Sequence, residues 1–152
     1  MVEKKLKELG IELPEVVKPV AAYVPAVQVG DFVYTAGQIP VVDGKVKYTG
    51  QIGKGRTVEE GYEAAKICAI NCLSAVKSLI GSLDKIEQIV KLTGFVNTEA
   101  GQGNQPLVLN GASEFLLEVF GEKGSHARSA VGVCGLPLDS LVEVEMIVKV
   151  KG

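Results

Sequence analysis

The sequence predicts one α+β domain in which a mixed β-sheet carries two helices on one face. Short apolar runs rich in β-branched residues alternate with two long helical segments, in the order β-β-β-α-β-α-β-β. Strands separated by helices need crossover connections, which place both helices on the same face of the sheet. The chain of 152 residues has no repeat and no long Pro/Ser-rich linker, so we expect a single domain over residues 1–152.

The first part of the chain is expected to form a short helix and then strands. Residues 2–9 place their apolar side chains on one side, and Gly10 follows as a stop signal; we assign residues 1–20 to an N-terminal extension. Residues 21–41 predict two strands joined at Gly30-Asp31, and residues 41–50 add a hairpin that turns at Asp43-Gly44.

The strongest helix is predicted after Arg56. Thr57 and Glu60 have capping-box spacing, and Gly81 ends the pattern. Its apolar face has a spacing of three and four residues, and its mostly small side chains allow close packing on a sheet: Ala65, Cys68, Cys72, Ala75, Val76 and Leu79.

A second helix and three more strands complete the order. The helix is expected over residues 105–120, with Pro106 in its first turn and Gly121 after its end. Strands are expected at residues 89–96, 127–136 and 141–150, and the last alternates apolar with mostly polar residues. The sheet face away from the helices keeps apolar residues and has no third layer, which favours an oligomer.

Composition restricts the classes of partner. The net charge of −2, the 5% aromatic content and the lack of Trp argue against a nucleic-acid-binding surface. No apolar run is long enough to cross a bilayer, the N-terminal residues are charged, and the number of cysteines, three, is odd. We therefore expect a cytoplasmic protein with reduced cysteines.

Several residues suggest chemistry but have simpler explanations. Cys68 and Cys72 are four apart on one helix face, yet no second ligand pair follows, so they are expected in the core and no metal is expected. His126 is read as a turn residue and Cys134 as a packed one, which disfavours a Ser–His or thiol nucleophile. The segment around Arg56 lacks the phosphate-loop pattern, so this arginine is read as a solvated charge.

Arg128 is a different case, because 14 of the 16 basic residues are lysines and this arginine opens an apolar strand. It is either an ordinary surface residue or a planar donor for a carboxylate. Glu143 lies on the following strand. If the two strands pair, its carboxylate would lie near the guanidinium and would orient it or hold a water molecule.

Four segments together resemble the YjgF/RidA family: AYVPAVQVGDFVYTAGQIPV, NGASEFLLEVFG, HARSAVGV and GLPLDSLVEVEMIV. Members are also called reactive intermediate deaminases, L-PSP endoribonucleases and translation inhibitors. The resemblance extends over about residues 22–150 and points to a subgroup with a longer chain. It implies a chorismate-mutase-like fold, a homotrimer with ligand clefts between subunits, and hydrolysis of enamines and imines such as 2-aminoacrylate to 2-keto acids and ammonia. It implies no metal or organic cofactor.

The resemblance also implies roles for individual residues. Arg128 matches the arginine that holds the substrate carboxylate, and Glu143 matches the glutamate that positions the hydrolytic water. Three further positions match substrate-binding residues of the family: Tyr23, Gly37 and Asn110.

Two substrate-binding positions depart from the family. Ala36 stands where many members carry Ser or Thr, and Ala130 stands where many carry Cys. The loss of these polar side chains predicts a more apolar substrate. It also leaves open a protein that binds small carboxylates without turnover; an endoribonuclease or translation inhibitor is the less favoured alternative.

Overall fold

The computed structural model describes residues 1–16, 18–19 and 21–151. Residues 17 and 20, which fall in the expected N-terminal extension, lie outside the described part. The structure confirms the α+β class, and its described residues form nine strands where the predicted order had six. The elements are α1 (Val2–Glu8), β1 (Ala26–Val29), β2 (Phe32–Thr35), β3 (Val41–Val42), β4 (Lys45–Val46), β5 (Gln51–Ile52), β6 (Gly55–Arg56), α2 (Val58–Ile80), β7 (Ile86–Asn97), α3 (Gln105–Phe120), β8 (Ala127–Val133) and β9 (Val142–Val150). Short 3-10 turns are η1 (Leu83–Lys85), η2 (Gly121–Gly124) and η3 (Pro137–Asp139).

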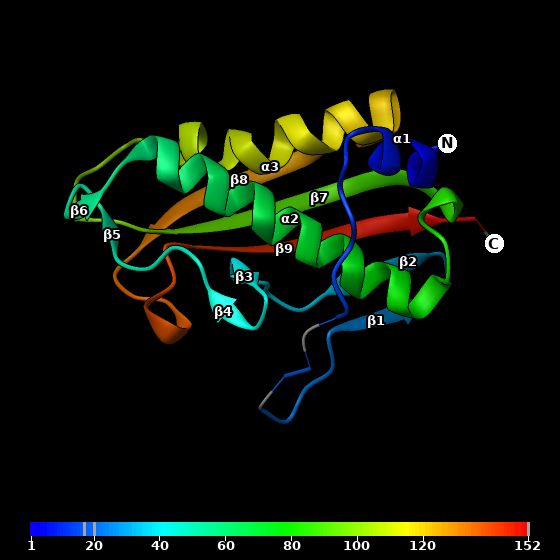
Figure 1. Cartoon of the computed structure of the whole chain (residues 1–152), viewed down its shortest axis with the longest axis horizontal. Helices are drawn as coiled ribbons and strands as arrows, with labels where there is room; N and C mark the ends of the chain where they lie inside the picture. The colour runs from blue at the N-terminus through cyan, green and yellow to red at the C-terminus, as the bar shows by residue number, and fades with distance from the viewer. Residues whose placement is uncertain (17, 20, 152) are drawn as a thin grey trace.

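The main sheet has the strand order β1-β2-β9-β7-β8. Only β7 and β8 run parallel, and the other neighbours are antiparallel. Helices α2 and α3 pack against each other on one face of this sheet, as predicted (Figure 1). The sheet is therefore mixed, and α3 is the crossover that connects its parallel pair.

Local signals explain where the elements begin and end. Thr57 Oγ1 accepts the Glu60 N–H at 3.1 Å, and the Glu60 carboxylate accepts the Thr57 N–H at 3.0 Å, which confirms the capping box. Asp43 and Gly44 both have positive φ, 52° and 79°, the requirement of the tight turn predicted between β3 and β4. Gly81 ends α2 at φ 84°.

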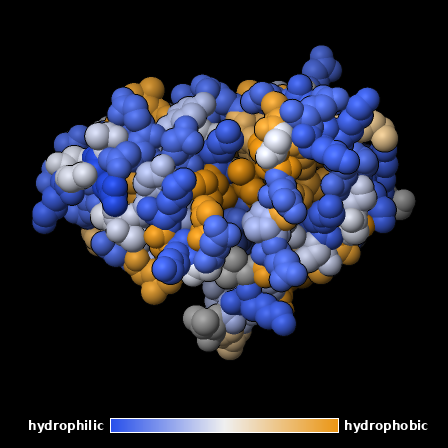
Figure 2. Space-filling model, in the orientation of Figure 1, coloured by the Kyte–Doolittle hydropathy of each residue, from blue (hydrophilic) through white to orange (hydrophobic). Residues whose placement is uncertain are grey.

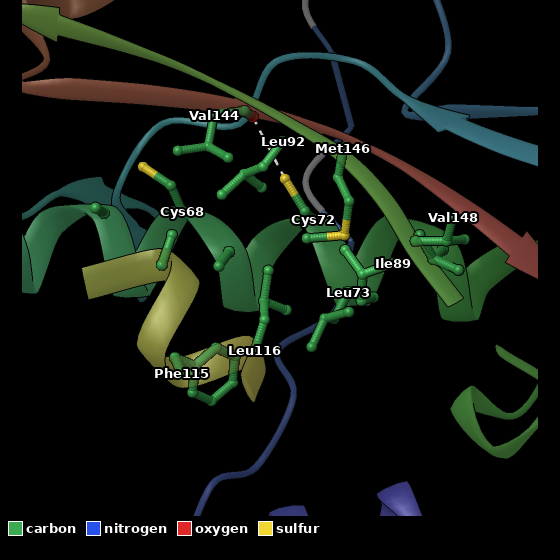
Figure 3. Close-up of a cluster of buried hydrophobic side chains, with 14 of the residues drawn as sticks. Cys68, Cys72, Leu73, Ile89, Leu92, Phe115, Leu116, Val144, Met146 and Val148 are labelled. Atoms are coloured by element: carbon green, nitrogen blue, oxygen red, sulfur yellow. Dashed lines mark hydrogen bonds between the residues drawn. The ribbon is translucent and has the colours of Figure 1, made fainter. Parts of the chain in front are cut away.

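The core lies between the sheet and the two helices (Figure 3). Cys68 and Cys72 are fully buried, and their thiols donate to the carbonyls of Val142 and Val144 on β9. Burial raises the pKa of the Cys72 thiol to about 12, and it also raises that of Cys68. The two cysteines are core residues, as predicted.

Three sequence-based expectations were wrong. Leu79 is 45% exposed, because the buried face of α2 continues through Ile80 instead. Cys134 is exposed, because β8 ends at Val133 and the chain then leaves the sheet. Arg56 is not a solvated charge: its guanidinium donates to the Thr49 carbonyl at 2.6 Å and pairs with Glu60 at 2.6 Å, which ties the β5–β6 segment to the start of α2.

The two faces of the molecule differ. The helix-covered face is largely hydrophilic, with hydrophobic surface exposed near its middle (Figure 2). No helix among the described residues covers the opposite face of the sheet, here called the open face. Strand alternation places on it a set of exposed apolar side chains, Val27, Val29, Phe32, Tyr34 and Val131. In the described part of the chain, no helix is long and apolar enough to span a bilayer.

Candidate functional site

Arg128 points to the helix-covered side of β8, where α3 holds its guanidinium. It lies beside the buried Leu92 of β7 in the parallel register, so it shares the side of the sheet that α3 covers. Its Nη1 donates to Asn110 Oδ1 at 2.9 Å and to Ser113 Oγ at 3.1 Å, and its Nη2 lies 3.5 Å from the Pro106 carbonyl. Asn110 and Ser113 are three residues apart on α3, which places both on one face.

No carboxylate in the described part of the chain neutralises Arg128. The three ion pairs there involve other cations: Arg56, Lys77 and Lys149. Half-buried Arg128 is held entirely by neutral oxygen atoms, and its Nε and Nη2 edge makes at most one long hydrogen bond. A guanidinium oriented in this way can present parallel N–H donors to a carboxylate.

Ser113 and His126 extend this group of residues, a feature that sequence reasoning missed. Ser113 Oγ lies 2.9 Å from His126 Nε2, and His126 Nδ1 lies 2.6 Å from the Gly124 carbonyl oxygen. Together with Asn110 and Arg128 they line a pocket of about 290 Å³. We call Asn110, Ser113, His126 and Arg128 the arginine group. The i, i+3 spacing of Asn110 and Ser113 was the available signal, but nothing in the sequence tied it to His126.

A second group forms around Gly37, at the end of β2. A Cβ atom at position 37 would overlap Glu143 Oε2, so only glycine lets this carboxylate lie against the backbone. The N–H groups of Ala36 and Gln38 bond to the carbonyls of Pro25 and Val144, whereas among the described residues the Gly37 N–H makes no hydrogen bond. That N–H is available to a ligand.

The pKa of Glu143 is raised, first by burial and then by the charge of Glu145 on the same side of β9. A carboxyl with a raised pKa takes up and releases protons nearer neutrality than an ordinary glutamate does. We call Tyr23, Gly37 and Glu143 the glutamate group.

A cleft of about 830 Å³ opens beside the glutamate group. Tyr23 and Gly37 line it, together with Asn71 of α2 and segments from the N-terminal extension. Leu138 also lines it; this residue is 75% exposed and has φ 55°, a conformation that leucine rarely adopts. The sequence had suggested no role for Leu138 or for the extension in the cleft. Three or more His, Cys, Asp or Glu side chains do not cluster as a metal site anywhere in the described residues.

Within one chain the arginine group and the glutamate group are far apart. Strand β7 lies between β8 and β9, so the pairing that would bring Glu143 beside Arg128 does not occur. Arg128 is in register with Leu92, and Glu143 with Phe95. Two strand spacings and three residues along the strand put their Cα atoms about 14 Å apart. Their side chains also leave opposite faces of the sheet, because Glu143 alternates with buried residues that face the helices.

Ala36 lies beside the glutamate group, and Ala130 lies beside the arginine group. Ala36 precedes Gly37 and is half-buried, and Ala130 lies two residues after Arg128 on the same side of β8, packed against the core. Neither supplies a polar side chain to its group. Of the predicted residues, the structure joins Arg128 with Asn110, and Gly37 with Tyr23 and Glu143.

Known proteins are similar to this chain in sequence and in fold. A family model described as "YjgF/chorismate_mutase-like, putative endoribonuclease" matches residues 3–150. Protein TCP17 of Trypanosoma cruzi is 42% identical over 149 residues, which cover 97% of this chain and 93% of that protein. A 2-iminobutanoate/2-iminopropanoate deaminase of Dermatophagoides farinae is 30% identical over 141 residues, covering 93% of this chain and 95% of the relative.

The fold agrees with a solved relative as well. The crystal structure of protein Atu1372 of Agrobacterium tumefaciens, described as having unknown function, superposes with a TM-score of 0.91 at 42% identity. The alignment covers 99% of this chain and 92% of that one. On the family model and these relatives, the chain belongs to the YjgF/chorismate-mutase-like family.

Proposed function

We propose that the protein hydrolyses reactive 2-imino acids to 2-keto acids and ammonia. The observation that carries this proposal is the half-buried Arg128 guanidinium, which has no carboxylate partner in the described residues and is oriented by Asn110 and Ser113. A substrate carboxylate would complete its hydrogen bonds. The deaminase name of a relative that is 30% identical supports the same reaction class.

The proposal requires a homotrimer, because one chain separates the two groups. In this arrangement the arginine group of one subunit meets the glutamate group of the next in a cleft between them. The apolar residues of the open face support association, since a surface of this kind is unfavourable in water. Each trimer then contains three equivalent clefts.

The proposed reaction needs no redox step. Arg128 binds the carboxylate of the imine, and the neighbouring subunit would bring the Gly37 N–H, which makes no hydrogen bond among the described residues, close to the reacting carbon. Glu143 of the partner subunit takes a proton from water as the water oxygen adds to the C=N carbon. The same carboxyl returns this proton to nitrogen, which gives a carbinolamine. It then carries the hydroxyl proton of the carbinolamine to nitrogen as the C–N bond breaks, so that ammonia leaves and the carbonyl of the 2-keto acid forms. The raised pKa of Glu143 suits both transfers.

Ala36 and Ala130 support an apolar substrate. Each position carries a methyl group where a hydroxyl or thiol would bind polar substituents. A hydroxyl that must be buried without a partner costs about 1–3 kcal/mol, so side chains such as those of 2-iminobutanoate are preferred over hydroxylated ones.

The test is to generate 2-iminobutanoate with an amino-acid oxidase and to follow its decay. The wild type is expected to accelerate the decay over buffer, and R128A to lose at least about a hundredfold of kcat/KM, because a charge-assisted bidentate contact is removed. The matched control is K91A, which removes a cation from the adjacent strand β7, where its ammonium donates to Ser129 Oγ at 3.4 Å. Wild-type protein that fails to accelerate the decay excludes this function.

The same two alanines favour one second candidate, a protein that binds 2-keto acids without turnover. Both remove groups that could polarise the imine nitrogen. A rise in melting temperature with added 2-oxobutanoate, in a preparation that leaves the imine decay unchanged, identifies this alternative.

A further inference from the structure

We infer that Ser113 and His126 form a proton-dependent second part of the Arg128 carboxylate site, in which protonation of His126 turns the Ser113 hydroxyl toward the bound anion. His126 is a positioning residue in this inference, because it acts on the ligand through Ser113. The inference rests on the proposed role of Arg128 in binding a carboxylate.

The hydrogen bonds determine where the protons lie when His126 is neutral. The Gly124 carbonyl can only accept, and it lies 2.6 Å from Nδ1, so Nδ1 carries the imidazole proton. Nε2 is then an acceptor, and the Ser113 hydroxyl, 2.9 Å away, must donate to it. Arg128 Nη1 donates to the same Ser113 oxygen at 3.1 Å. The Ser113 proton is therefore directed at His126 and is not available to a ligand.

Protonation of His126 reverses this bond. Nε2 becomes a donor, and the Ser113 oxygen accepts from both His126 and Arg128. The Ser113 hydroxyl no longer donates its proton to His126, so this proton can rotate toward the pocket that these residues line. Acidification thus adds one positive charge and one free donor beside the guanidinium, and both changes favour an anion.

Few other charged groups lie close to His126 at this site. Of the residues that line the pocket, Arg128 is the only other charged one. On the neighbouring elements, Lys91 of β7 contacts Ser129 at 3.4 Å, and Glu114 of α3 accepts from Tyr62 at 2.6 Å. Three further charged residues of α3 and η2 do not line the pocket: Glu118, Glu122 and Lys123. In the proposed trimer Glu143 of the partner subunit also faces the cleft and requires its own control.

His126 is the only histidine in the chain, which makes its titration directly observable. In ¹⁵N NMR spectra of imidazole-labelled protein at pH 8, the Nδ1–H tautomer is expected, with Nε2 unprotonated. S113A is expected to change the Nε2 shift and leave Nδ1 bonded to the Gly124 carbonyl. A dominant Nε2–H tautomer, or an Nε2 signal indifferent to S113A, overturns the inference without any ligand.

The functional test measures the affinity for pyruvate, whose carboxylate stays ionised from pH 5.5 to 8. The wild type is expected to bind about tenfold more tightly at pH 5.5, with proton uptake seen by calorimetry in buffers of different ionisation enthalpy. H126Q keeps a neutral hydrogen-bonding side chain. At every pH from 5.5 to 8 it is expected to bind pyruvate with the weak affinity that the wild type shows at pH 8. In S113A the pH effect should fall to less than about threefold, because only the distant charge remains.

Two control variants separate other causes. K123Q removes a neighbouring charge that does not line the pocket and is expected to keep the full pH effect. E143Q removes the Glu143 carboxylate, which faces the cleft in the proposed trimer. This variant is also expected to keep the full pH effect on pyruvate affinity.

The possible outcomes separate this inference from the proposed function. Pyruvate binding with equal affinity at both pH values overturns the inference alone. Absence of pyruvate binding at every pH overturns both it and the carboxylate role of Arg128. Pyruvate binding that strengthens at pH 5.5 through His126, in a protein without imine hydrolysis, supports the inference and excludes the deaminase.

Discussion

At the scale of single residues, the sequence was most informative where a residue type is rare. Arg128 stood out because lysine fills most basic positions, and its lack of a carboxylate partner in the described residues is what a ligand-binding role requires. His126 lies in the turn between η2 and β8, as predicted, but its hydrogen bond to Ser113 depends on how α3 and β8 pack and was not foreseen. Contacts of this kind connect separate elements, and neither spacing nor periodicity encodes them.

A residue-scale prediction concerns the pH dependence of the reaction. As the proposed base, Glu143 must be ionised, so kcat/KM falls as pH drops through its raised pKa. Glu145 is one cause of that raised pKa. E145Q is therefore expected to move the acidic limb of the profile to lower pH, whereas E87Q, which removes a carboxylate paired with Lys149, leaves it in place. If the acidic limb of the E145Q profile stays at the pH of the wild type, a group other than Glu143 controls that limb.

A second residue-scale prediction links Glu143 to stability. Because its pKa is raised on folding, the ionised carboxylate destabilises the native state at neutral pH. E143Q is expected to raise the melting temperature at pH 8 and to abolish turnover, a trade that is common at active sites. The stabilisation should shrink as pH falls and vanish below about pH 4, where unfolded glutamate is also protonated. Melting curves for both proteins at pH 8 and pH 4 test this, and equal melting temperatures at pH 8 contradict it.

At the scale of elements, capped helices and tight turns could be predicted because their signals are local. The capping box at Thr57 and the turn at Asp43-Gly44 each occupy at most four consecutive residues. The pair β5 and β6 was missed, because two-residue strands are too short to show a period. The position of β7 between β8 and β9 was missed for a different reason. Strands that pair over long sequence separations carry no pattern in their own sequences that identifies the partner.

The packing of α2 on α3 yields an element-scale prediction. A Cβ atom on Gly111 of α3 would overlap the Tyr62 carbonyl oxygen of α2, and backbone cannot rotate away as a side chain can. G111A is expected to cost about 3 kcal/mol, even though alanine favours a helix over glycine. Gly103 has open space around its Cα and ordinary φ, so G103A is the matched control and should stay within about 0.5 kcal/mol of the wild type. Urea unfolding measures both, and equal midpoints would refute the close approach.

At the scale of the whole molecule, the sequence pattern anticipated an uncovered apolar sheet face but could not show why the site needs it. The proposed function supplies a reason, because Arg128 and Glu143 leave opposite faces of the sheet, with β7 between their strands. Such a chain can unite both groups only across a subunit interface. Association would then serve two purposes, since it covers the apolar side chains and completes the catalytic site.

Mixed trimers test this arrangement directly. In the proposed trimer, R128A and E143Q are each expected to inactivate every cleft of their own homotrimer. When equal amounts are unfolded and refolded together, a cleft is intact if its arginine group comes from E143Q and its glutamate group from the neighbouring R128A subunit. Random assembly gives this combination in about one cleft of four, so about a quarter of wild-type activity is expected to return.

The control for this experiment mixes the two proteins after separate refolding, which should restore nothing until subunits exchange. A chain that carried both groups in one site would give no active cleft in any mixture of the two variants. Recovered activity therefore requires Arg128 and Glu143 to act from different subunits. Light scattering on the refolded sample checks the expected mass of three chains, and a monomer that retains full wild-type activity would refute the shared cleft.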